Sequence, residues 1–98
     1  MIRNRMRPIH PGEILREEFL TPLGMSAHQL ALRLHVPPNR ISSILNGTRI
    51  ITADTALRLA RFFRTTPEFW LNLQKTYELR LAEDELGAII EHDVQPGA

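Results

Sequence analysis

The 98-residue sequence contains no cysteine, a single lysine and no apolar run approaching the ~20 residues of a membrane-spanning helix. Without cysteine, disulfide bonds and thiolate metal sites are excluded. The basic start of the chain, MIRNRMRPIH, is not followed by an apolar stretch, so we do not expect it to be a secretory signal. The length suits one domain with one core. We therefore expect a single cytoplasmic domain over residues 1–98, with a core from about 10 to 86 and no membrane contact.

Motifs of catalysis and of metal binding are also missing. The sequence shows no Ser-His-Asp arrangement, no glycine-rich phosphate loop and no carboxylate pair placed for acid-base chemistry, so we expect neither an enzyme nor a cofactor. His28 and His35 are seven residues apart and have no further ligands at a suitable spacing, which argues against a metal site. The acidic run at residues 83–85 is better explained as a solvated helix end.

The net charge of +1 hides a division between the two halves of the chain. Residues 1–64 carry ten arginines against four carboxylates, a net charge of +6, whereas residues 65–98 carry a net charge of −5. Such asymmetry indicates one part that faces nucleic acid and another that faces a different partner. Arginine suits bidentate contacts with phosphate or guanine, although a GC-rich coding bias would produce the same preference. Arg3, Arg5 and Arg7 fit either a phosphate-following arm or a solvated tail.

The segment from Ser26 to Gly47 predicts two short amphipathic helices joined by a tight turn. Its apolar positions are Leu30, Ala31 and Leu34 in the first helix and Ile41, Ile44 and Leu45 in the second. Ala31 is small enough for two steeply crossing helices to approach. The outward face of the second helix carries Pro38, Asn39, Arg40, Ser42, Ser43 and Asn46, short polar groups of the kind that read base edges. A helical bundle gives similar apolar spacing, but the short turn and the absence of Glu and Lys on the outer face favour a DNA-binding helix-turn-helix.

Helical periodicity extends over nearly the whole chain and predicts an all-α fold of five helices. The helices are expected to begin near Pro11, Ser26, Pro38, Thr52 and Thr66, where proline or a capping residue marks each start. The fifth helix is expected to end near Leu86, with a frayed tail after it.

The fifth predicted helix has more apolar residues than one buried face requires. One stripe consists of Phe69, Trp70, Leu73 and Tyr77. Such a surface either closes a small core or binds a partner helix, and we expect both, with part of the stripe in a dimer interface. A two-fold dimer would pair two recognition helices on a palindrome.

Three blocks of the sequence resemble the HigA antitoxin family: HPGEILREEFLTPLGMS, LALRLHVPPNRISSILNG and RIITADTALRLARFFRTTPEFWLNLQKTYEL. Together they cover about residues 7–82. The resemblance implies a lambda-repressor-like five-helix fold and a homodimer that binds a palindromic operator of its own operon. It also implies neutralisation of a HigB-type toxin, a small ribonuclease that cuts mRNA on the ribosome. The acidic C-terminal half is our candidate for contact with a basic toxin.

The resemblance further implies which residues contact DNA. They are Ser26, Ala27, Pro38, Asn39, Arg40, Ser43, Asn46 and Arg49. We expect Asn39 to pair with adenine, while Arg40 suits either guanine or a phosphate. Pro37 and Pro38 replace the Ser or Thr usual at this helix start. The alternative is a stand-alone phage-repressor-like regulator without a toxin, and a small basic reading frame upstream of the gene would argue against it.

Overall fold

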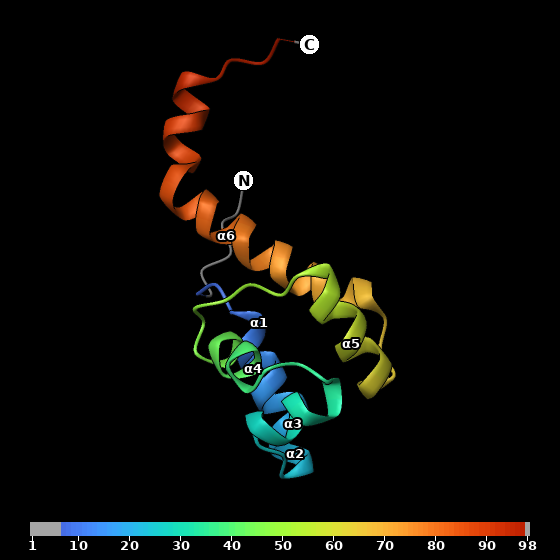
Figure 1. Cartoon of the computed structure of the whole chain (residues 1–98). Helices are drawn as coiled ribbons and strands as arrows, with labels where there is room; N and C mark the ends of the chain where they lie inside the picture. The colour runs from blue at the N-terminus through green and yellow to red at the C-terminus, as the bar shows by residue number, and fades with distance from the viewer. Residues whose placement is uncertain (1–6, 98) are drawn as a thin grey trace.

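The computed structural model describes residues 7–97, and all the regular structure in that range is helical (Figure 1). Its elements are, in chain order, α1 (Pro11–Ile14), η1 (Leu15–Leu20), α2 (Thr21–Leu23), α3 (Ala27–Leu34), α4 (Pro38–Leu45), α5 (Ala53–Phe63) and α6 (Pro67–Asp93). The first three follow one another without a break, so five separate helical rods result. The predicted all-α fold of five helices is confirmed.

The first rod contains a π-helical stretch, η1, that the periodicity did not predict. At its end the Thr21 N–H donates to the carbonyl of Arg16, five residues earlier. Pro22 follows directly; it has no N–H, and in a regular α-helix its ring would clash with the carbonyl four residues before it. The widened turn accommodates that ring. Gly24 then ends the rod with a φ of 61°, a left-handed conformation that glycine adopts without strain.

Each predicted helix start is confirmed, and most have a side-chain cap. His10 accepts a hydrogen bond from the Gly12 N–H at the start of α1, and Thr52 and Thr66 accept equivalent bonds at the starts of α5 and α6. Ser26 forms the predicted capping box at α3. At α4, Pro37 occupies the cap position and provides no side-chain hydrogen bond.

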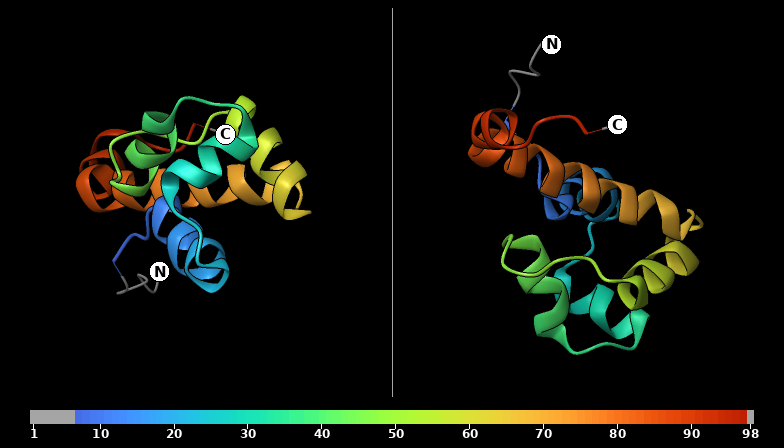
Figure 2. Two further views of the ribbon diagram at one scale, coloured as in Figure 1. Left: turned by 60° about the horizontal axis from the view of Figure 1, so that its bottom comes forward. Right: turned by 90° about the horizontal axis from the view of Figure 1, so that it is seen from above.

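The core lies where α1 and α5 meet both α6 and the α3–α4 pair. α1 contacts α4 and α6, and α5 contacts α3 and α6, so α6 and the α3–α4 pair lie on opposite sides of the domain (Figure 2). The buried apolar residues are Leu15, Leu20, Leu30, Ala31, Leu34, Val36, Ile41, Ile44, Ile51, Ala56, Leu59, Ala60 and Trp70. The predicted apolar positions of the helix-turn-helix are among them, except that Leu45 is only partly buried.

The helix α6 is longer than the sequence pattern indicated. Its first part packs on the core, and its last turns extend away from the other helices (Figure 1). The prediction that it ends near Leu86 with a frayed tail is wrong, because the helix continues to Asp93. Gly87 does not stop it, since one glycine inside a helix costs only about 1 kcal/mol relative to alanine.

Candidate nucleic-acid interface

The helices α3 and α4 form a compact helix-turn-helix. Leu30, Ala31 and Leu34 are buried on one face of α3, opposite Ile41 and Ile44 of α4. The buried Ala31 removes side-chain bulk where the two helices cross. The two short helices are therefore fixed relative to one another by burial of their shared apolar face.

The turn between α3 and α4 reverses direction within three residues. His35 adopts a left-handed conformation with a φ of 59°, and the Val36 N–H donates to the Ala31 carbonyl at 3.1 Å. Val36 is buried beneath the turn. His35 thus ends α3 rather than lying on it, so it does not share a helix face with His28. Residues 7–97 contain no group of three potential metal ligands.

The end of α4 is held by α1. Gly12 packs so closely under α4 that a Cβ there would lie 2.1 Å from the Ile44 carbonyl oxygen. The His10 ring lies beside Gly47, which has a φ of 78° and follows the C-cap Asn46. These contacts fix the position of α4 relative to the rest of the domain.

Most of the predicted DNA-contacting residues lie on the accessible side of the helix-turn-helix. Ser26, Pro38, Asn39, Asn46 and Arg49 are exposed, while Ala27, Arg40 and Ser43 are half-buried. On α4, Asn39, Ser43 and Asn46 are spaced by four and three residues, which places them on one helix face. Ser26 is already engaged, because its hydroxyl accepts from the Gln29 N–H at 3.1 Å.

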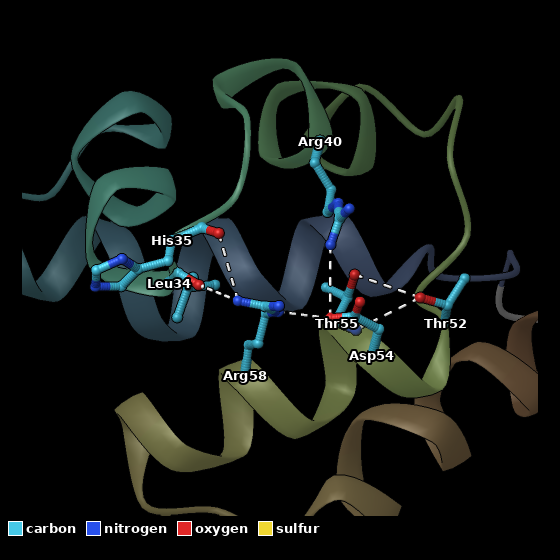
Figure 3. A network of polar contacts seen from close by, with 7 residues as sticks. All are labelled: Leu34, His35, Arg40, Thr52, Asp54, Thr55 and Arg58. Carbon is cyan, nitrogen blue, oxygen red and sulfur yellow. Dashed lines mark hydrogen bonds and ion pairs between the residues drawn. The ribbon is translucent and has the colours of Figure 1, made fainter.

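Arg40 belongs to a polar network that the sequence analysis missed (Figure 3). Its Nη1 lies 3.6 Å from Oδ1 of Asp54 in the first turn of α5. The same oxygen accepts from Nε of Arg58 at 2.5 Å, and Nη1 of Arg58 donates to the Leu34 carbonyl at 2.8 Å. The network connects the start of α4, the start of α5 and the end of α3. The i, i+4 spacing of Asp54 and Arg58 was the only signal of it in the sequence.

The charges of this network favour the ionised form of Asp54. The hydrogen bond from Arg58 is the main cause that lowers the pKa of the Asp54 carboxyl, and the positive charges of Arg58 and Arg40 act in the same direction. Desolvation opposes them only in part. Asp54 is therefore a carboxylate at neutral pH.

Arg7 forms an ion pair within the domain and is not part of a flexible arm that follows phosphates. Its Nη1 and Nη2 donate to the two carboxylate oxygens of Glu13 at 2.8 and 2.9 Å. Both side chains are accessible, so the pair contributes little to stability. Arg3 and Arg5, the other members of the basic start, lie outside the described residues.

Four residues were predicted to lie in a dimer interface, and for Trp70 this prediction is wrong. It is completely buried, and its Nε1 donates to Oγ1 of Thr65 at 2.8 Å, so Trp70 is a core residue that no partner can reach. Its bulk fills the space against Phe19 at a ring distance of 4.9 Å. The other three line an apolar groove between the start of the chain and α6, whose members are Ile9, Ile14, Phe69, Asn72, Leu73, Thr76, Tyr77 and Arg80.

None of the helices within residues 7–97 has the length and apolar character needed to cross a membrane. The arrangement instead presents two separate surfaces. One is the polar face of α4 with Arg49 beside it, and the other is the apolar groove on α6.

The sequence is similar to those of known helix-turn-helix proteins. Residues 15–70 match a helix-turn-helix family model. The chain is 55% identical to Virulence-associated protein I of Dichelobacter nodosus over 87 residues, covering 89% of this chain and 81% of that protein. It is 40% identical to Antitoxin HigA-1 of Vibrio cholerae over 79 residues, covering 81% of this chain and 74% of that protein.

Solved structures agree with these relatives. An addiction-module antidote protein of the HigA family from Coxiella burnetii is 61% identical, with a TM-score of 0.90 over 94% of this chain and 100% of that one. The Pseudomonas aeruginosa antitoxin HigA, in a structure with the higBA promoter, is 46% identical with a TM-score of 0.90 over the same shares. At these identities and coverages the likeness extends beyond the fold to the sequence as a whole.

Proposed function

The chain belongs to the HigA antitoxins of the helix-turn-helix family, and from this premise we propose that it represses its own operon and neutralises a toxin. In this proposal a homodimer binds a palindromic operator through α3 and α4. The partner toxin is of the HigB type, and the protein acts in the cytoplasm without catalysing a reaction.

One observation carries the DNA-binding part of the proposal: the accessible face of α4. Asn39, Ser43 and Asn46 share that face, and none of them forms part of the core. Their amide and hydroxyl groups match the donors and acceptors of base edges in the major groove. Arg49 is exposed just after α4. In this proposal it supplies a cation for a DNA phosphate. The helix is also held rigidly from behind by α1, as base readout requires.

The direct test is binding of the purified protein to the DNA upstream of its own operon. Affinity for this duplex and for a scrambled duplex is measured by fluorescence anisotropy at about 150 mM salt, where the Debye length is ~8 Å. We expect tight, sequence-dependent binding of a dimer. Equal affinity for both duplexes would refute operator recognition.

Asn39→Ala tests the role of α4 in reading bases. We expect loss of discrimination at one base step per half-site, by about 1–3 kcal/mol, because a bidentate contact with adenine is removed. Gln95→Ala, an exposed amide in the tail after α6, is the control and should change nothing. Uniform weakening on every sequence would instead place Asn39 at a phosphate.

The proposed dimer uses the apolar groove on α6. The accessible parts of Phe69, Leu73 and Tyr77 line it, and two-fold pairing would cover them. Thr76→Arg introduces a charge into the groove at an exposed position, so the core is spared, and it should yield a monomer in light scattering. Leu32→Arg, which changes a residue of α3 that is 62% exposed, should remain a dimer. If the Thr76→Arg protein is still a dimer, the dimer interface is not in this groove.

The proposed toxin contact is the outer part of α6. Glu83, Asp84 and Glu85 are exposed there together with apolar side chains such as Leu86 and Ile90, which suits a basic partner with an apolar patch. Replacing the three carboxylates by amides should weaken toxin binding and make it less dependent on salt. Unchanged toxin affinity in this variant, and after removal of residues 83–98, would defeat the assignment.

The product of the neighbouring gene distinguishes an antitoxin from a stand-alone regulator, because only an antitoxin binds a toxin encoded beside it. Co-expression with the product of the adjacent small reading frame should restore growth and yield a stable complex. Operator binding without such a complex would leave the stand-alone regulator.

A further inference from the structure

We propose that Asp54 is a positioning residue for DNA recognition, which orients Arg40 toward the edge of a guanine and limits binding to non-specific DNA. The inference rests on the proposed function, because it requires that α4 enters the major groove. It concerns a residue of α5, outside the helix-turn-helix itself.

The carboxylate of Asp54 is held by Arg58 of the same helix, α5, and Arg58 is itself bonded to the end of α3. Arg58 donates from Nε to Asp54 and, from Nη1, to the Leu34 carbonyl at the end of α3 (Figure 3). A second, longer bond of 3.4 Å joins the same Nη1 to the His35 carbonyl. Because a guanidinium is planar and rigid, these bonds fix the carboxylate relative to the turn of the helix-turn-helix.

Arg40 faces this fixed carboxylate from the first turn of α4. Its side chain is 27% exposed, which shows that it lies against the protein surface rather than extending into solvent. The 3.6 Å contact joins Nη1 to Oδ1 of Asp54, and the Arg40 guanidinium forms no other ion pair within residues 7–97. An arginine has five N–H donors, so most of them remain available to a ligand. Asp54 thus selects a direction for Arg40 before DNA is bound.

A base edge fits this arrangement better than a phosphate. A phosphate bound by Arg40 would approach the Asp54 carboxylate, and the like charges would repel each other. A guanine edge carries no net charge and offers its O6 and N7 acceptors to two donors of one guanidinium. An arginine already oriented by a carboxylate loses less side-chain entropy on making that bidentate contact. The carboxylate therefore favours guanine over phosphate as the ligand of Arg40.

The surroundings of Asp54 give it a second effect on binding. It lines a surface depression between α3 and α5 together with Arg33, Arg58, Arg61 and Arg64, and it is the one carboxylate among the residues of that depression. Without it, no carboxylate would offset the positive charge of the four arginines in this depression. Such a charge attracts any DNA regardless of sequence.

A simpler role for Asp54 is stabilisation of the α5 N-terminus, where a carboxylate interacts favourably with the helix dipole. Glu68 provides a matched comparison, because it is the second residue of α6 as Asp54 is the second residue of α5, and both are exposed. Glu68 belongs to α6, which lies on the opposite side of the domain from the α3–α4 pair. Glu68→Gln therefore removes the same charge from the same helical position without touching Arg40.

The experiment compares the wild-type protein with Asp54→Asn, Arg40→Ala, the double variant and Glu68→Gln. For each protein, affinity is measured for the operator, for operators with each base pair of a half-site replaced in turn, and for a scrambled duplex. In Asp54→Asn we expect discrimination at one G·C pair per half-site to fall roughly tenfold, the size of a bidentate contact. Affinity for the scrambled duplex should rise. The same replacement in the Arg40→Ala background should cause no further loss of discrimination, and Glu68→Gln should behave as wild type.

Three results would overturn the inference alone. Asp54→Asn could strengthen binding to every duplex by the same factor, which would assign Arg40 to a phosphate. It could lower discrimination equally with and without Arg40, or leave discrimination unchanged. If Asp54→Asn melts below the assay temperature, Asp54→Ser, which keeps a short polar side chain in the first turn, replaces it in the same cycle. Absence of any operator preference in the wild-type protein would instead refute the proposed function.

Discussion

Replacement of Gly12 by alanine tests how closely α1 packs against the recognition helix. The added Cβ would lie 2.1 Å from the carbonyl oxygen of Ile44 and 3.0 Å from the Cα of Leu45. Both are backbone atoms, so no change of rotamer relieves the collision. The Cβ and the Ile44 carbonyl oxygen would have to move apart by more than about 1 Å to restore ordinary contact, in an interior that is otherwise close-packed.

The expected cost follows from two opposing effects. Overpacking a core destabilises proteins by about 1–3 kcal/mol and sometimes more. Alanine regains about 0.5–1 kcal/mol over glycine through its helix propensity. Since the obstacle is backbone, we expect a net loss of about 2 kcal/mol in the free energy of unfolding, which lowers the melting temperature by roughly 8–16 °C in a domain of this size.

Thermal unfolding followed by circular dichroism measures this loss, and two other glycines serve as controls. Gly24 has a φ of 61° and no neighbour within 4 Å, so Gly24→Ala reports the cost of a left-handed backbone alone, about 1–2 kcal/mol. Gly97→Ala meets neither constraint and should be neutral. Operator affinity should also fall in Gly12→Ala, because the displaced atoms belong to the end of α4. A melting temperature equal to or above wild type in Gly12→Ala would refute the packing argument.

Three further predictions concern a cap, a buried amide and a phosphate contact. Burial lowers the pKa of His10 from its ordinary 6.5, so the stability contributed by its neutral ring is complete above that value and is lost as the pH falls through the lower folded-state pKa. Unfolding in urea at about pH 7.5 and about pH 5.5 should reveal this loss, and His10→Asn, which caps without titrating, should reduce it; an equal pH dependence in both proteins would contradict it. Gln74→Leu leaves the buried N–H of Ile51 without its 2.9 Å acceptor and should cost about 1–3 kcal/mol in the same assay, whereas a neutral outcome would mean that the N–H finds another partner. Arg49→Ala should reduce the steepness of log affinity against log salt by about 0.9, and an unchanged slope would place Arg49 away from the phosphates.

Local signals in the sequence were sufficient for the helix starts and for the helix-turn-helix. Capping residues act within three or four positions along the chain, so Ser26, Thr52 and Thr66 could be assigned without knowledge of the fold. The alternation of apolar and polar positions in α3 and α4 predicted their buried face for the same reason. The exposed polar face of α4 followed from that periodicity.

Features that depend on contacts between distant segments were not predictable in this way. The apolar stripe of α6 was assigned in part to a dimer, but Trp70 is buried because Phe19, fifty-one residues earlier, packs on it. The pairing of Arg40 with Asp54 joins two helices whose crossing the sequence does not specify. The length of α6 was underestimated because its outer turns have no buried face to produce a periodic pattern.

The placement of α1 between the recognition helix and α6 has a consequence for the order of folding. During synthesis, α1 leaves the ribosome well before the helices it packs on. The contact of Gly12 with Ile44 and that of Phe19 with Trp70 can form only after the later residue of each pair has been synthesised. Closing such long loops costs entropy that is recovered only when the contacts form. The α3–α4 unit, whose partners are neighbours in sequence, can pair earlier. A nascent chain that has exposed its helix-turn-helix but not yet α6 can therefore bring Gly12 against Ile44, whereas Phe19 still lacks Trp70, so the side of the first rod that packs on α6 is completed last.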